Sequence, residues 1–143
     1  MKKVHIKWLF VIAWMIIIFV FSNQPAVISD GNSQTIIKIF RALGINLNGF
    51  FGDLADFAVR KSAHFLEYLF FSLLIYNACR ETYSISKSIF IALGLVFFYA
   101  GTDEIHQLFV QGRTGRFRDV LIDTSGGATG MLIVYMCKAC SKK

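Results

Sequence analysis

The apolar positions of this 143-residue chain gather into four long runs, at about 4–21, 57–79, 88–110 and 120–137. A membrane-spanning helix needs ~20 predominantly apolar residues. The second and third runs reach that length only if their charged ends are counted as helix. We therefore predict an all-α fold, a four-helix transmembrane bundle, in which these charged ends belong to the spans. Charge at membrane depth is costly, so those side chains need a partner or a function.

The longest connection, residues 23–56, carries a weaker helical pattern. Pro25 should end the first span, because proline cannot continue the hydrogen-bond ladder. Apolar residues then recur at helical spacing: Ile36, Ile39, Phe40 and Leu43. We predict a short interfacial amphipathic helix, starting at a Ser33 cap and ending at Gly44. A helix that simply covers the top of the bundle is the alternative. Residues 46–53, with two glycines, are predicted to form a turn.

Composition supports the membrane class. The chain is 55% hydrophobic and 15% aromatic, with 17% charged residues, and a soluble domain of this length cannot bury that much apolar surface. With one proline and no low-complexity stretch, residues 1–143 are expected to form a single membrane domain. The net charge of +6 does not predict nucleic-acid binding, since many of the cations flank spans.

The flanking cations predict the topology. Six of them lie near the two ends of the chain: Lys2, Lys3, Lys7, Lys138, Lys142 and Lys143. Cytoplasmic flanks retain cations, so we expect a multi-pass protein with both termini cytoplasmic and the first and third loops outside. The third loop, with Arg113, Arg116 and Arg118, opposes this trend.

Each of the last three runs has a polar stripe at the end facing the outer loops. At about 100° per residue, the following residues share faces: Arg60, Lys61, His64 and Glu67 on the second run, Asp103, His106 and Gln107 on the third, and Asp119 and Asp123 on the fourth. Glu104 should point away from its stripe. Gly126 and Gly130 have the small-xxx-small spacing that lets helices approach closely. Packing should turn the stripes inward to form one pocket.

Several chemistries fit such a pocket. The side chains can form a purely structural network, with Arg60 or Lys61 paired to Asp119 or Asp123. Proton transfer is a second possibility, with these candidate catalytic residues: His64, Glu67, Asp103 and His106. Imidazole and carboxylates also suit a divalent metal. However, the spacings form no complete metallohydrolase motif, so we predict no metal and no cofactor.

The third loop favours an anion. Residues 111–118 contain two glycines and three arginines, and guanidinium groups bind phosphate or carboxylate in bidentate fashion. We expect a lipid head group, a pyrophosphate or a peptide carboxylate as ligand, with ordinary anionic phospholipid as the simpler alternative. The predicted ligand-binding residues are Gln24, Arg60, Lys61, His64, Glu67, Asp103, Gln107, Arg113, Arg116, Asp119 and Asp123.

The polar segments resemble the VanZ family of small bacterial membrane proteins, whose founding member is associated with teicoplanin resistance. The resemblance rests on Phe21-Ser22-Asn23-Gln24-Pro25, Arg60-Lys61-Ser62-Ala63-His64-Phe65-Leu66-Glu67-Tyr68, Asp103-Glu104-Ile105-His106-Gln107, Gly112-Arg113, and Asp119 to Gly126, in family order. Gln111 stands where the family pattern has proline. The resemblance implies a bacterial cell-membrane protein linked to glycopeptide antibiotic tolerance, and it assigns no catalytic roles.

These observations together lead to one main prediction of function. The chain is expected to bind an anionic cell-envelope ligand, a lipid-linked wall precursor or a lipoglycopeptide, in an extracytoplasmic pocket and so contribute to teicoplanin tolerance. The alternative is an intramembrane enzyme, a hydrolase or transferase, acting on a lipid-linked envelope substrate. A structural or assembly partner is a third possibility. Membrane lipid is the expected partner in each case.

Overall fold

The computed structural model describes residues 2–140, with side chains from residue 3, and that part of the chain contains helices and no strand. The helices follow in the order α1 (Lys2–Ser22), α2 (Ala26–Ala42), α3 (Leu47–Phe51), the 3₁₀ turn η1 (Gly52–Leu54), α4 (Ala55–Cys79), α5 (Ile85–Gln107) and α6 (Phe117–Cys140). The predicted all-α class is confirmed. The four predicted runs correspond to α1, α4, α5 and α6.

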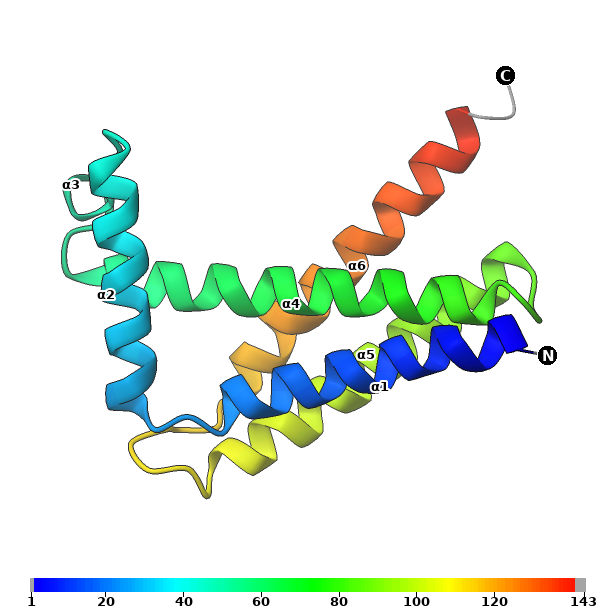
Figure 1. Ribbon diagram of the computed structural model, residues 1–143, viewed down its shortest axis with the longest axis horizontal. Coiled ribbons are helices and arrows are strands. Elements are labelled where there is room, and N and C mark those ends of the chain that lie inside the picture. The colour runs from blue at the N-terminus through cyan, green and yellow to red at the C-terminus, as the bar shows by residue number, and fades with distance from the viewer. Residues whose placement is uncertain (1, 141–143) are drawn as a thin grey trace.

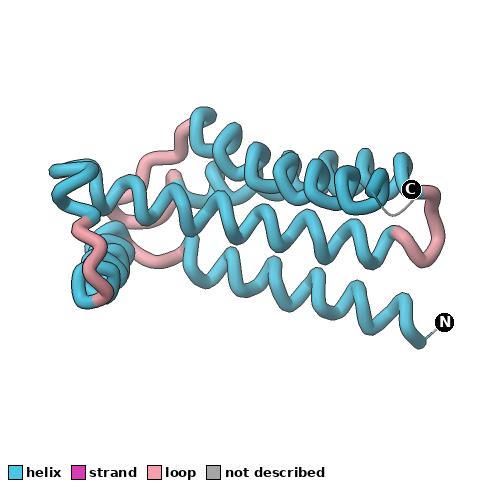
Figure 2. The backbone as a smooth tube through the Cα atoms, turned by 90° about the horizontal axis from the view of Figure 1, so that it is seen from above, coloured by secondary structure: helices cyan, strands magenta, loops and turns pink. Residues whose placement is uncertain are grey.

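The four long helices pack into one bundle in which α6 crosses α4 obliquely, and α2 crosses one end of this bundle (Figures 1 and 2). Helix α4 contacts α1, α2, α5 and α6, so it is the interior helix of the bundle. The turn between α4 and α5 lies at the opposite end from α2, together with the start of α1 and the end of α6. The connections α1–α2 and α5–α6 lie at the α2 end.

Three helices are long and apolar enough to cross a membrane: Lys3–Ser22, Ile85–Gln107 and Phe117–Cys140. Helix α4 is not among them, because polar residues such as Arg60, Lys61, His64 and Glu67 lower its hydropathy. Many of its polar side chains face other helices instead of the surroundings of the bundle. The predicted count of four spans is therefore not established by length and composition.

Helix α2 corrects one predicted boundary and confirms another. It begins at Ala26, directly after Pro25, so the predicted cap at Ser33 is wrong. Ser33 is buried inside the helix, and its hydroxyl donates to the carbonyl of Ser29. The predicted end at Gly44 is confirmed. Gly44 has φ +86°, and the N–H of Ile45 donates to the carbonyl of Phe40 at 2.9 Å, which closes the helix.

Residues 46–53 also differ from the prediction. They form α3 and the start of η1 instead of a simple turn. The Asn46 side chain accepts the N–H of Gly49 at 3.1 Å, which caps this single helical turn. Because Asn is also a common turn residue, the sequence pattern did not separate the two structures.

The third loop is longer on its α5 side and shorter on its α6 side than the hydrophobic runs predicted. Helix α5 ends at Gln107, and α6 already begins at Phe117. The charged ends of α4 and α5 are helical, as predicted, so Asp103, Glu104, His106 and Gln107 all belong to α5.

Glycines bring α6 close to its neighbours, as the spacing predicted. A Cβ built on Gly126 would overlap the carbonyl oxygen of Phe65 in α4. A Cβ on Gly130 would overlap the hydroxyl of Ser72 in the same helix, and one on Gly127 would lie 2.7 Å from Val96 in α5. Helix α6 therefore packs against α4 and α5 at a distance that larger residues would prevent.

The end of the bundle opposite α2 is tied by one surface ion pair. Lys7 Nζ lies 2.5 Å from a carboxylate oxygen of Glu81 and donates to the Asn77 side chain at 2.9 Å.

Of the flanking cations used to predict topology, Lys142 and Lys143 lie outside the described residues, as does the side chain of Lys2. The side of the membrane on which the termini lie stays a prediction.

Candidate functional site

The polar ends of α1, α4, α5 and α6 meet beneath α2, and the α5–α6 loop is fastened against them. The N–H of Ala26 donates to the carbonyl of Gln111 at 3.1 Å. Arg113 Nε donates to the carbonyl of Gln24 at 3.1 Å. The Glu104 carboxylate accepts the N–H of Arg116 at 2.8 Å. These bonds position the arginines of the loop opposite the charged face of α4.

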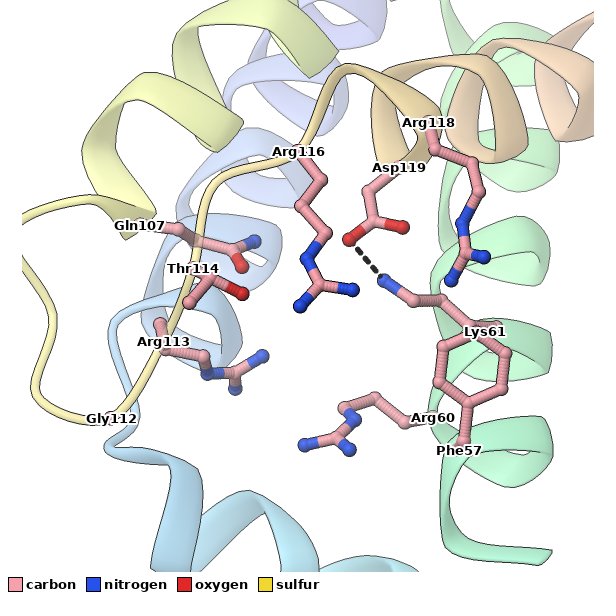
Figure 3. A pocket seen from close by; sticks show the side chains of 10 residues that line it. All are labelled: Phe57, Arg60, Lys61, Gln107, Gly112, Arg113, Thr114, Arg116, Arg118 and Asp119. Atoms are coloured by element: carbon pink, nitrogen blue, oxygen red, sulfur yellow. Dashed lines mark ion pairs between the residues drawn. The ribbon is translucent and has the colours of Figure 1, made fainter. Parts of the chain in front are cut away.

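A cavity of about 230 Å³ lies between this loop and α4 (Figure 3). Its lining residues are Phe57, Arg60, Lys61, Gln107, Gly112, Arg113, Thr114, Arg116, Arg118 and Asp119. Five of these are cations and one is an acid. We call this cavity the cationic pocket. The side chains of Arg60, Arg113 and Arg116 extend into the same space from opposite walls.

Two of the five cations have carboxylate partners among the described residues. Lys61 Nζ lies 2.7 Å from Asp119 Oδ2, and Arg60 Nη1 lies 2.7 Å from Asp30 Oδ1. The Lys61–Asp119 pair is one of the structural contacts that the sequence predicted. The other three, Arg113, Arg116 and Arg118, have no carboxylate within ion-pair distance in the part of the chain described here.

Arg113 is a partly buried cation of the loop. Burial, followed by the neighbouring charge of Arg60, lowers the pKa of the Arg113 guanidinium from its ordinary value. Both causes penalise the charged form, and a bound anion would offset both. Arg113 is therefore a residue beside which a bound anion would be favourable.

A second cavity of about 350 Å³ lies between α2 and α4, and we call it the side cavity. Arg60 and Arg113 line it as well as the cationic pocket, so the two cavities share a wall. Its other polar lining includes Gln24, His64 and Glu67. The amide of Gln24 is held by the Asn32 side chain at 2.9 Å.

Behind these cavities lies a cluster formed by His64 of α4, Asp103 of α5 and Asp123 of α6. One donor atom from each lies within 4.8 Å of the other two. His64 Nδ1 is 3.7 Å from Glu67 Oε2 and 4.0 Å from Asp123 Oδ1. The cluster therefore joins three helices at one point.

Asp103 is held in place from the α1 side. Gln107 Nε2 donates both to Asp103 Oδ2 at 3.3 Å and to the hydroxyl of Ser22 at 3.0 Å. Ser22 and Gln107 are both buried, so this chain of hydrogen bonds holds the carboxylate of Asp103 in the interior of the bundle.

His106 lies apart from the other predicted catalytic candidates. Its Nε2 lies 3.0 Å from the Asn23 side-chain oxygen, and its ring stacks near Phe19 at 4.7 Å between centroids. It therefore packs against the end of α1, whereas His64, Glu67 and Asp103 gather between the helices. The predicted ligand-binding residues line one or both cavities or belong to the buried cluster.

Some residues of the site had no signal in the sequence strong enough to find them. Asp30 lies within α2, outside every predicted stripe, yet it pairs with Arg60. Glu104, which was expected to point away from the polar stripe of α5, is buried and anchors the loop. Arg118, by contrast, is one of the three loop arginines that favour an anion, and it lines the cationic pocket and lies over the Phe57 ring, 5.2 Å from its centroid.

Comparison with known proteins gives one match. The model of the VanZ/LLP1 family matches residues 7–138, which is nearly the whole chain. No curated protein and no solved structure matches it.

Proposed function

From the premise that this chain belongs to the VanZ/LLP1 family, we propose that it is an integral membrane protein that binds an anionic cell-envelope ligand. The ligand is a lipid-linked wall precursor or a lipoglycopeptide, and its binding contributes to tolerance of glycopeptide antibiotics such as teicoplanin. Tolerance enters the proposal through the family resemblance, and anion binding through the chemistry of the site.

The observation that carries the proposal is the cationic pocket. Five cations and one carboxylate surround a single cavity, and Arg113 and Arg116 have no carboxylate partner among the described residues. Uncompensated cations repel one another when they are confined in a partly dry space. An anion with several acceptor oxygens relieves that repulsion and accepts charge-assisted hydrogen bonds.

The volume of the pocket favours one part of such a ligand. Pockets for drug-sized molecules usually occupy about 300–1,000 Å³. A cavity of about 230 Å³ suits a phosphate, diphosphate or carboxylate group better than a whole lipoglycopeptide. We therefore propose that the pocket holds the charged group, while the remainder of the ligand lies in the lipid or outside the protein.

The interior position of α4 supports the proposed membrane placement. We propose that α4 is a fourth span, shielded by the three more apolar helices, which explains how a helix with Arg60 and Glu67 can lie at membrane depth. The chain is then a multi-pass protein of the bacterial cell membrane with both termini in the cytoplasm. The cationic pocket opens on the extracytoplasmic side, where wall precursors are used.

An intramembrane enzyme acting on the same class of ligand is the second candidate. It is favoured by the position of His64, whose Nδ1 lies 3.7 Å from Glu67 and 4.0 Å from Asp123 beside a cavity that Arg113 also lines. An imidazole next to carboxylates can accept and return a proton. In this alternative the arginines bind the substrate and His64 carries the proton.

Two variants separate these functions. Arg113→Ala removes a pocket cation, and His64→Gln keeps size and hydrogen bonding but removes imidazole acid–base chemistry. Arg41→Ala, an exposed cation of α2 outside both cavities, serves as the matched control. Each protein is tested for binding of a polyprenyl diphosphate in micelles and for teicoplanin tolerance of cells that express it.

The binding proposal predicts that Arg113→Ala weakens diphosphate binding and abolishes tolerance, while the Arg41→Ala control keeps both. If folded His64→Gln protein binds normally but has lost tolerance, the enzyme is favoured. Binding unchanged by Arg113→Ala would contradict the proposed pocket. Tolerance unchanged by both variants would favour a structural role.

A further inference from the structure

The buried cluster behind the two cavities has features that anion binding does not use. His64 is 8% exposed, Asp103 4% and Asp123 1%, so all three residues are more than nine-tenths buried. They come from three different helices. Buried carboxylates are normally paired or hydrogen-bonded, because burying an isolated charge is costly.

Two polar atoms of this cluster have no hydrogen-bond partner among the described residues. They are His64 Nδ1 and Asp123 Oδ2. The nearest ion-pair contacts of His64 Nδ1, to Glu67 and Asp123, are 3.7 and 4.0 Å long, beyond ordinary hydrogen-bond length. Such orphaned atoms in a native interior need an explanation, and an unseen ion is one of the standard ones.

We infer that His64, Asp103 and Asp123 form a binding site for a divalent transition-metal ion. Ligand atoms around one ion at about 2.1 Å can be at most ~4.2 Å apart. The three donor atoms lie within 4.8 Å of one another, so small side-chain movements complete the site. Glu67, 3.7 Å from the imidazole, is placed to supply a further oxygen ligand.

The charges and the second layer of contacts suit an ion. The carboxylates of Asp103 and Asp123 balance the +2 charge of the ion, so the site formed with neutral His64 is electrically neutral, and an ionised Glu67 as a further ligand would add one negative charge. The bond from Gln107 to Asp103 orients that carboxylate from outside, as supporting residues do in metal sites.

The donor set indicates the class of metal. Imidazole suits zinc and neighbouring transition metals, whereas carboxylates suit manganese and the hard cations. One nitrogen with two or three oxygens therefore fits Zn²⁺ or Mn²⁺ better than Ca²⁺. The tertiary structure thus points to a metal where the sequence spacing predicted none, because the ligands come from separate helices instead of one local motif.

The test measures metal binding directly in the full chain. Protein in micelles is stripped with EDTA, titrated with Zn²⁺ and separately with Mn²⁺, and its metal content is measured after gel filtration. The expected result is one ion per chain. His64→Gln and Asp123→Asn should each weaken binding by more than about 100-fold. The matched controls His106→Gln and Asp53→Asn, a histidine and a carboxylate outside the cluster, should bind as the parent does.

If His64→Gln and Asp123→Asn fail to fold, replacing His64 by another metal-ligating residue still tests the site. In His64→Cys, bound Co²⁺ should give a thiolate-to-metal charge-transfer absorption band, which would be absent if residue 64 had only a structural role. Arg113→Ala should keep its metal, so failure of the anion pocket and failure of the metal site are distinguishable. Absence of one tightly bound ion in the parent, or undiminished binding in His64→Gln, would overturn the inference.

Discussion

Replacing Gly126 by alanine tests the close packing of α6 against α4, which brings the site together. The new Cβ would overlap the carbonyl oxygen of Phe65 and lie 3.0 Å from its carbonyl carbon. These are backbone atoms of α4, so no side-chain rotation relieves the contact, and the helices must separate. Gly94 of α5 is the matched control, because a Cβ there meets no atom within 4 Å.

The expected magnitude follows from two opposing effects. Alanine stabilises a helix interior by roughly 0.5–1 kcal/mol relative to glycine, and this gain applies to both variants. Overpacking costs about 1–3 kcal/mol and applies to Gly126→Ala alone. The two variants should therefore differ by about 1–3 kcal/mol in free energy of unfolding. That difference is a factor of about 5–150 in the unfolding equilibrium constant.

Reversible unfolding in mixed micelles, with SDS as denaturant and tryptophan fluorescence and circular dichroism as readouts, measures the difference. Gly94→Ala should equal or exceed the parent in stability, and Gly126→Ala should fall below Gly94→Ala. Equal stability of the two variants would refute the close contact between α6 and α4.

Three further predictions concern single side chains. Lys61→Met should destabilise the fold by about 3 kcal/mol, because Asp119 Oδ2 would lose its ion-pair partner while Asp119 Oδ1 already lacks a hydrogen bond. Thermal unfolding in micelles measures this loss, and the double variant Lys61→Met/Asp119→Leu should recover part of it. A hydrogen bond from Lys7 and the charge of Lys7 lower the pKa of Glu81. The Lys7–Glu81 contact therefore contributes its full stabilisation of the fold above the ordinary glutamate pKa of about 4.3, and this stabilisation is lost as the pH falls through the lowered pKa of Glu81. Unfolding measured against pH should accordingly lose part of its acid dependence in Lys7→Met, and an unchanged profile would contradict the pairing. Tyr68→Phe, measured with EDTA present, should leave stability unchanged or raise it by up to ~1 kcal/mol, because the buried hydroxyl has no partner among the described residues; a clear loss would mean that the hydroxyl is bonded.

The long helices could be predicted from the sequence because apolar length is a local property of the chain. Even so, the start of α2 was missed. Pro25 was interpreted only as the end of the first span, and Ser33 as the cap of the next helix. Whether the helix already starts after Pro25 depends on whether that stretch of chain can lie against α4. That is a tertiary contact. The end of α2 at Gly44 was predictable, because a left-handed closing residue is a local requirement.

The site was predictable only as a set of helix faces. Helical periodicity places His64, Asp103 and Asp123 on inward faces, but not at the same depth. The relative depth of the three helices decides which acids meet the imidazole, and that depth is set by contacts such as those of Gly126. Asp30 and Glu104 were missed for the same reason, because their partners lie in other segments of the chain.

The most direct test of the account is contact between a phosphate and the arginines of the cationic pocket. Protein labelled with ¹⁵N in its arginine side chains is saturated with a polyprenyl diphosphate, and solid-state NMR measures dipolar coupling between ³¹P and the guanidinium nitrogens. The account predicts close phosphorus–nitrogen contacts that weaken in Arg113→Ala and persist in Arg41→Ala. A saturated complex without such contacts, or with the same contacts in Arg113→Ala, would contradict it.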